Sequence, residues 1–132
     1  MKNSAISKIL SMKIIAVVGM SPNPERPSHF VSKYMINNGF NIIPVNPGQK
    51  EILGLRCYPA LKDIKYEVDI VNVFRNSDYA TPIIQEAISI KAKAIWLQDG
   101  IVSSEGKQMA KDNNITYIEN DCILRIHKRL YE

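Results

Sequence analysis

The chain has 132 residues, of which 45% are hydrophobic and 23% charged, a mixture that fits one globular domain and excludes a disordered or fibrous chain. Its formal net charge is +4, but the basic residues are scattered, which argues against a nucleic-acid-binding module. No apolar run approaches the ~20 residues that span a bilayer, so we expect no membrane partner. Cys57 and Cys122 make neither a disulfide framework nor a metal-ligand spacing, so we expect no metal and a cytoplasmic location.

Short apolar runs rich in β-branched residues predict five strands. The first, Ile14–Val18, is uninterrupted, as is typical of a strand covered on both faces. Pro44 has no backbone N–H, so we expect the second strand at the edge of the sheet, or Pro44 at the end of that strand. The four later strands are expected at residues 42–45, 68–74, 94–97 and 115–118.

Between these runs the apolar residues take a helical spacing. Phe30–Met35 and Ile83–Ile88 each carry such a face, and Gly39 is the stop signal of the first of these helices. Residues 1–12 form a leading segment, for which we expect a short helix with Ile6, Ile9 and Leu10 on one face. The expected N-caps of the later helices are Ser77 or Asp78, Ser103 or Ser104, and Asn120 or Asp121.

Strands that alternate with helices predict a parallel sheet with right-handed crossovers. We therefore expect a single α/β domain over residues 1–132. Its predicted fold is a Rossmann-like three-layer fold, in which helices cover both faces of a five-stranded parallel sheet of order 3-2-1-4-5. Ligands of such sheets bind beyond the carboxyl ends of the strands, so the residues after Val18, Val45, Phe74 and Leu97 are the candidate functional residues.

The loop after the first strand has the features of a phosphate-binding loop. Gly19 permits a sharp turn and a close backbone approach, and a helix N-terminus follows with its free N–H groups. Ser21 and Ser28 can donate hydroxyl hydrogen bonds, and Arg26 can supply a bidentate, charge-assisted fork. The alternative is a plain surface loop, with Pro27 in the first helical turn or Ser28 as a cap.

The dinucleotide-binding fingerprint is incomplete in this chain. The second and third glycines of the pattern G-x-G-x-x-G are replaced by a proline-rich loop. At the end of the second strand, Asn46 stands where an NAD site would offer an acidic residue to the ribose hydroxyls. Asn46 can still form hydrogen bonds, so a phosphorylated adenine nucleotide other than NAD is favoured.

Eight segments of the chain form a joint pattern: Ala16–Pro22, Arg26–Ser28, Pro44–Pro47, Glu51–Gly54, Val68–Val71, Phe74-Arg75, Trp96–Gly100 and Asp121–Ile123. Together these segments resemble the small stand-alone CoA-binding proteins of the YccU type, which resemble in turn the nucleotide-binding domain of the succinyl-CoA synthetase α subunit. The resemblance covers nearly the whole chain and implies a Rossmann-like fold that binds coenzyme A at the carboxyl edge of the sheet.

The resemblance also implies roles for single residues. Gly19, Ser21, Arg26 and Ser28 would hold the pyrophosphate, and Lys50 would contact the 3′-phosphate, displaced by one position from the lysine of the synthetase. Phe74 and Arg75 would border the adenine or pantetheine passage, and Trp96 with Gln98 would line its outer wall. The alternatives are core packing for Phe74 and Trp96, an ion pair with Asp78 or a turn cap for Arg75, and a turn-shaping role for Gln98.

Cys122 follows the last strand at an expected helix start, a setting that favours thiol chemistry. It could face the thiol of CoA and form a reversible mixed disulfide, or it could be a small buried hydrophobic residue.

These patterns predict a protein that binds CoA or an acyl-CoA and has no catalytic residues of its own, acting as a sensor or a redox-linked carrier. Two alternatives remain open: an NAD(H)-binding regulator, and a non-catalytic or partner-dependent subunit of an acyl-CoA ligase. A homodimer is equally open.

Overall fold

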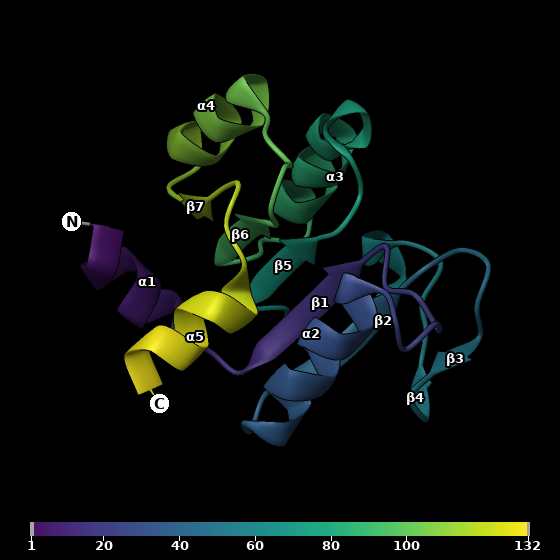
Figure 1. Ribbon diagram of the computed structural model, residues 1–132. Helices are drawn as coiled ribbons and strands as arrows, with labels where there is room; N and C mark the ends of the chain where they lie inside the picture. The colour runs from purple at the N-terminus through teal and green to yellow at the C-terminus, as the bar shows by residue number, and fades with distance from the viewer. Residues whose placement is uncertain (1, 132) are drawn as a thin grey trace.

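Five parallel strands form the central sheet of the computed structural model, which describes residues 2–131 (Figure 1). Met1, which the expected leading helix includes, lies outside the described residues. A separate two-stranded antiparallel hairpin, β3–β4, follows β2. In chain order the elements are α1 (Lys2–Leu10), β1 (Ile14–Val18), α2 (Pro27–Asn37), β2 (Asn41–Val45), β3 (Glu51–Ile52), β4 (Leu55–Arg56), the 3-10 turn η1 (Leu61–Asp63), β5 (Ile70–Val73), α3 (Ser77–Ser89), β6 (Ala94–Leu97), α4 (Ser104–Asp112), β7 (Thr116–Ile118) and α5 (Ile123–Tyr131).

The expected Rossmann-like fold is confirmed, with one difference in the position of a strand. The order across the sheet is β2-β1-β5-β6-β7, so the third strand of the sheet, β5, lies beside β1 and not outside β2 as expected. Pro44 explains why β2 is an edge strand. Its carbonyl oxygen faces outward and accepts a hydrogen bond from the Tyr58 N–H (3.0 Å), but Pro44 has no N–H to donate to a further strand on that side.

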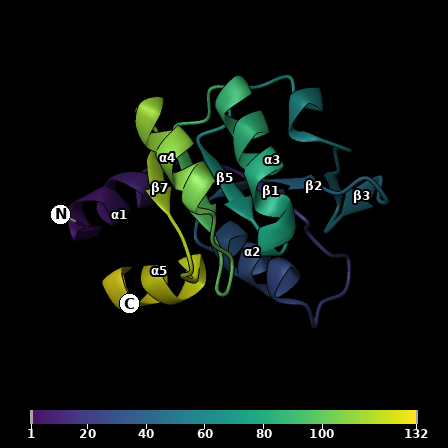
Figure 2. The ribbon, with the colours of Figure 1, turned by 90° about the horizontal axis from the view of Figure 1, so that it is seen from above.

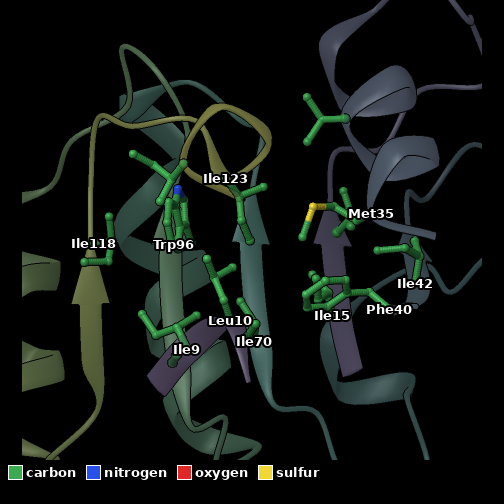
Figure 3. Packing of buried hydrophobic residues seen from close by; sticks show 14 of the residues in the cluster. Ile9, Leu10, Ile15, Met35, Phe40, Ile42, Ile70, Trp96, Ile118 and Ile123 are labelled. Atoms are coloured by element: carbon green, nitrogen blue, oxygen red, sulfur yellow. The ribbon is translucent and has the colours of Figure 1, made fainter. Parts of the chain in front are cut away.

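Helices cover both faces of the sheet (Figure 2). One face packs against α1, α2 and α5, and Figure 3 shows side chains from these helices and from β1, β2, β5 and β6 meeting in one cluster. The opposite face packs against α3, α4 and η1. Alternate residues of each inner strand therefore point into different cores, which explains why these strands are uninterrupted apolar runs.

The leading helix is confirmed, because Ile6 and Ile9 of α1 are fully buried against the sheet and Leu10 is nearly so. The expected cap of α4 is also confirmed, since the Ser103 Oγ accepts a hydrogen bond from the Gly106 N–H (2.9 Å). The cap of α3 is Asn76, one residue before the expected Ser77 or Asp78; its side chain accepts from the Asp78 N–H (3.1 Å). Within residues 2–131, no helix combines the length and the apolar character needed to cross a membrane.

Backbone hydrogen bonds align the carboxyl ends of the strands. The Gly19 N–H donates to the Val45 carbonyl oxygen (2.9 Å), the Phe74 N–H to that of Val18 (2.9 Å), and the Gln98 N–H to that of Val73 (3.2 Å). The residues that directly follow β1, β5 and β6 thus lie in one row along the edge of the sheet, where ligands of this architecture bind.

Candidate functional site

A pocket of about 600 Å³ lies at the carboxyl edge of the sheet, between the start of α2 and the start of α5. It brings together seven of the residues that the sequence singled out, contributed by four separate segments of the chain. These seven are Gly19, Ser21, Arg26, Ser28, Phe74, Gln98 and Cys122.

Hydrogen bonds within the loop after β1 fold it against the start of α2. The Ser21 N–H donates to the Ser28 Oγ (2.9 Å), and the Asn23 N–H donates to the Ser21 Oγ (3.0 Å). The buried His29 completes the arrangement, because its Nδ1 donates to the Ser21 carbonyl oxygen (2.9 Å). Both serine oxygens act as acceptors within the loop, so each hydroxyl proton remains available to a ligand oxygen.

Arg26 stands directly before α2 with an extended backbone, and its side chain forms no cap for that helix. Its side chain is exposed at the pocket, and Pro27 occupies the first turn of the helix. The guanidinium and the positive end of the α2 dipole therefore act on the same region of the pocket, which favours a bound anion.

Gly19 makes the turn from β1 into this loop with φ +85°, a conformation that side chains disfavour. A Cβ at this position would lie 2.9 Å from the Arg75 Cδ. Arg75 thus packs against Gly19 without lining the pocket, and its guanidinium lies over the ring of Tyr79 (4.4 Å to the centroid).

Asn46 and Lys50 lie on the neighbouring loop, after β2, and do not line the pocket. The Asn46 Nδ2 donates to the Met20 carbonyl oxygen (2.9 Å), and its Oδ1 accepts from the Gly48 N–H (2.8 Å). Asn46 therefore ties the loop after β2 to the loop after β1. Lys50 is exposed and lies directly before β3, at the end of the loop after β2.

Polar and charged groups line the pocket on the α5 side. Gln98 is 4% exposed, and its Nε2 donates to the Asn72 Oδ1 (2.5 Å). Asp99 is held by a bidentate contact from Arg125 (2.8 and 3.0 Å), whose guanidinium also reaches Asp121 (2.8 Å). Hydrogen bonding to Arg125 holds the pKa of Asp99 below its usual value, so Asp99 stays ionised and its negative charge is partly offset by that guanidinium.

Trp96 was expected in the outer wall of the site, and the structure corrects this expectation. Its side chain is fully buried in the core formed with α1 and α5 (Figure 3), and its Nε1 donates to the Asp121 carbonyl oxygen (2.9 Å). Side chains alternate along a strand, and Trp96 lies within β6 and not after it. The core-packing alternative is therefore the correct one for Trp96.

Sequence reasoning did not assign five of the pocket residues to the site: Pro27, Phe30, Val31, Asp99 and Ile101. The sequence placed Phe30 on the apolar face of its helix, and only the structure shows that its side chain stays 47% exposed at the pocket. Ile101 gave no signal either, since its place depends on how the loop after β6 folds.

The family model described as a CoA binding domain matches residues 13–128 of this chain. The chain belongs to the CoA binding domain family. That assignment agrees with the geometry, since the match includes the loop after β1, the loop after β2 and the start of α5. The match begins after α1, which in this member of the family packs onto the sheet.

This CoA binding domain is 44% identical over 115 residues to the uncharacterized protein YneT of Bacillus subtilis, covering 87% of this chain and 85% of that protein. A hypothetical protein from Pyrococcus horikoshii OT3 has a similar structure, with a TM-score of 0.94 and 32% identity, covering 100% of this chain and 93% of the other. The chain is also 31% identical over 101 residues to the ADP-forming acetate–CoA ligase II of Archaeoglobus fulgidus, covering 75% of this chain but 15% of the ligase.

Proposed function

We propose that the protein binds coenzyme A, free or acylated, in the pocket between α2 and α5. The observation that carries the proposal is the pairing of Arg26 with two available serine hydroxyls at the start of α2, in a member of the CoA binding domain family. A cation, O–H donors and a helix N-terminus are groups that each favour a bound pyrophosphate.

The rest of the pocket suits the long arm of the ligand. Phe30, Val31, Phe74 and Ile101 supply apolar surface beside the methylene and methyl groups of pantetheine, while Gln98 supplies an amide for its peptide-like bonds. Small-molecule sites commonly combine apolar walls with a few placed polar groups in this way.

The adenosine end of CoA would lie toward Lys50, across the loop after β1. In this arrangement Lys50 contacts the 3′-phosphate, and Arg75 borders the adenosine passage beside Gly19. Asn46 supports the arrangement indirectly, by holding the two loops together through Met20 and Gly48. Asn46 thus occupies the position that is acidic in an NAD site, and its amide is already hydrogen-bonded to backbone groups.

We propose a binding role without catalysis by this chain alone, as a sensor or a redox-linked carrier of CoA in the cytoplasm. A chain with two cysteines and no disulfide framework suits a reducing compartment. The similarity to a segment of an acetate–CoA ligase keeps a partner enzyme as the alternative.

The test is a titration of two variants with CoA and with dephospho-CoA at fixed salt. Arg26→Ala is expected to lower the affinity for both ligands, because both keep the pyrophosphate. Lys50→Ala is expected to lower the affinity for CoA only, because dephospho-CoA lacks the 3′-phosphate. One charge-assisted contact is worth about 1.5–3 kcal/mol, or roughly ten- to hundredfold in affinity.

Arg129→Ala is the matched control, since Arg129 is an exposed cation on α5 that does not line the pocket. It removes the same charge and is expected to change the affinity for either ligand less than about threefold. If Arg26→Ala and Arg129→Ala behave alike, the pyrophosphate assignment is wrong. If Lys50→Ala weakens both ligands equally, the 3′-phosphate assignment is wrong, and Arg56 becomes the next candidate.

A further inference from the structure

An amide and a thiol side chain lie together at the α5 end of the pocket. Gln98 follows β6 and Cys122 precedes α5, and both line the pocket. The Asp121 N–H donates to the Leu97 carbonyl oxygen (3.4 Å), a bond that places residue 122 next to residue 98. The row of residues along the carboxyl edge of the sheet therefore ends in an amide beside a thiol.

The amide of Gln98 is engaged at one atom only. Its Nε2 donates to the Asn72 Oδ1, whereas its Oε1 accepts no hydrogen bond from any residue in the range 2–131. No fully buried side-chain nitrogen or oxygen of these residues lacks a partner, so the Oε1 must open to the pocket although Gln98 is 96% covered. An acceptor held in this position and left open suits an N–H donor of a ligand.

The two cysteines differ in their surroundings. Cys57 is buried in the core, its thiol is directed at the Asn46 carbonyl oxygen (3.5 Å), and burial raises the pKa of that thiol. Cys122 is half-buried and lines the pocket, with its N–H fixed by the Asp121 carboxylate (2.9 Å). A ligand in the pocket can therefore reach the thiol of Cys122 and not that of Cys57.

We propose that Cys122 captures CoA as a mixed disulfide by thiol–disulfide exchange, with the Gln98 Oε1 accepting the N–H of the ligand's nearest amide. The proposal rests on the proposed function. The chemistry of CoA matches the two protein groups in order, because a short methylene link separates its terminal thiol from an amide N–H. When the sulfur of CoA is bonded to Cys122, the nearest amide N–H of CoA therefore lies beside the neighbouring Gln98.

The exchange needs no separate oxidant when the incoming ligand is a disulfide of CoA. The Cys122 thiol loses its proton to water, and the thiolate attacks the sulfur of the bound CoA half. The Cys122–CoA bond forms as the original sulfur–sulfur bond breaks, and the other half leaves as a thiolate that takes a proton from water. Two equivalents of a small free thiol remove the adduct: the first attacks the mixed disulfide, the second displaces the first as a small-thiol disulfide, and both CoA and Cys122 return as thiols.

The experiment follows adduct formation by intact-protein mass spectrometry after addition of CoA disulfide, with glutathione disulfide as the comparison reagent. Wild type and Cys57→Ser are expected to gain one CoA unit that a reducing agent removes, and Cys122→Ser to gain none while its circular dichroism stays native. Binding before reaction is expected to make CoA disulfide about tenfold or more faster than glutathione disulfide. Gln98→Met, checked for its thermal stability, is expected to reduce that ratio.

Each other outcome overturns a defined part of the proposal. An adduct on Cys57, no adduct, or equal rates with both disulfides overturns the exchange site. If Gln98→Met leaves the ratio of the two rates, CoA disulfide over glutathione disulfide, unchanged, Gln98 has no positioning role. Reduced CoA is titrated in parallel: if it binds the wild type while no adduct forms, the exchange site alone fails, whereas if it does not bind, the proposed function itself fails.

Discussion

Gly19 shows how a single residue sets the geometry of the site. Its backbone turns with φ +85°, its N–H joins β1 to β2 through the Val45 carbonyl oxygen, and the stem of Arg75 lies where its side chain would be. The sequence indicated the need for a glycine here, because a phosphate loop must turn sharply after the strand. It could not indicate that Arg75 fills the space, since that contact joins residues far apart in the chain.

Gly19→Ala is expected to lower the free energy of unfolding by about 1–2 kcal/mol, the cost of a left-handed backbone for a residue with a Cβ. Urea denaturation measures the change. Gly48→Ala is the matched control, because a Cβ there meets only the Asn46 Oδ1 at 3.5 Å, and its effect is expected within about 0.5 kcal/mol. If both substitutions lowered the free energy of unfolding equally, the backbone turn at Gly19 would not require a glycine.

At the scale of elements, Asp69 fastens the amino ends of three strands. Its Oδ2 accepts from the Ile14 N–H at the start of β1 (3.1 Å), and its backbone carbonyl accepts from the Ala94 N–H at the start of β6 (2.9 Å). Lys93 adds an ion pair (3.1 Å). Burial alone would raise the pKa of Asp69, but the Ile14 N–H and Lys93 outweigh it and hold the pKa below its usual value.

A carboxylate whose pKa is depressed in the folded protein stabilises the fold above its unfolded pKa and loses that contribution as the pH falls through its folded pKa. Asp69→Asn is therefore expected to destabilise the protein at pH 7, by about 1–2 kcal/mol, and progressively less below about pH 4. Urea denaturation across this pH range measures both effects. The exposed Asp112 on α4 supplies the control, Asp112→Asn, and a loss at Asp69 that does not shrink in acid would contradict the account.

Local pattern was sufficient to predict most elements but not the order of the sheet. Apolar runs and helical spacing located five strands and five helices, including α1, because those signals lie within a few residues of one another. The position of β5 beside β1 depends on a long connection that crosses the sheet. The β3–β4 hairpin was missed because its turn is Leu53-Gly54, and a leucine with φ 54° gives no turn signal in the sequence.

At the scale of the whole molecule, the site is made where separate segments converge. The phosphate loop could be predicted because Gly19, Ser21, Arg26 and Ser28 are close in sequence. The other wall could be predicted only in part, since Cys122 and Gln98 were found but Trp96 was misplaced. Trp96 lies within β6 with its ring in the core, two residues before Gln98, which lines the pocket.

The central claim is that this edge of the sheet selects CoA and not a nicotinamide dinucleotide. Asn46 carries no charge that could attract the ribose hydroxyls of NAD⁺, and its amide is hydrogen-bonded to the backbone of Met20 and Gly48. Arg26 and Lys50, by contrast, are exposed and can contact phosphates. Calorimetric titration of the reduced protein with CoA and with NAD⁺ at the same salt concentration tests this directly. We expect CoA to bind more tightly; equal or tighter binding of NAD⁺ would contradict the account.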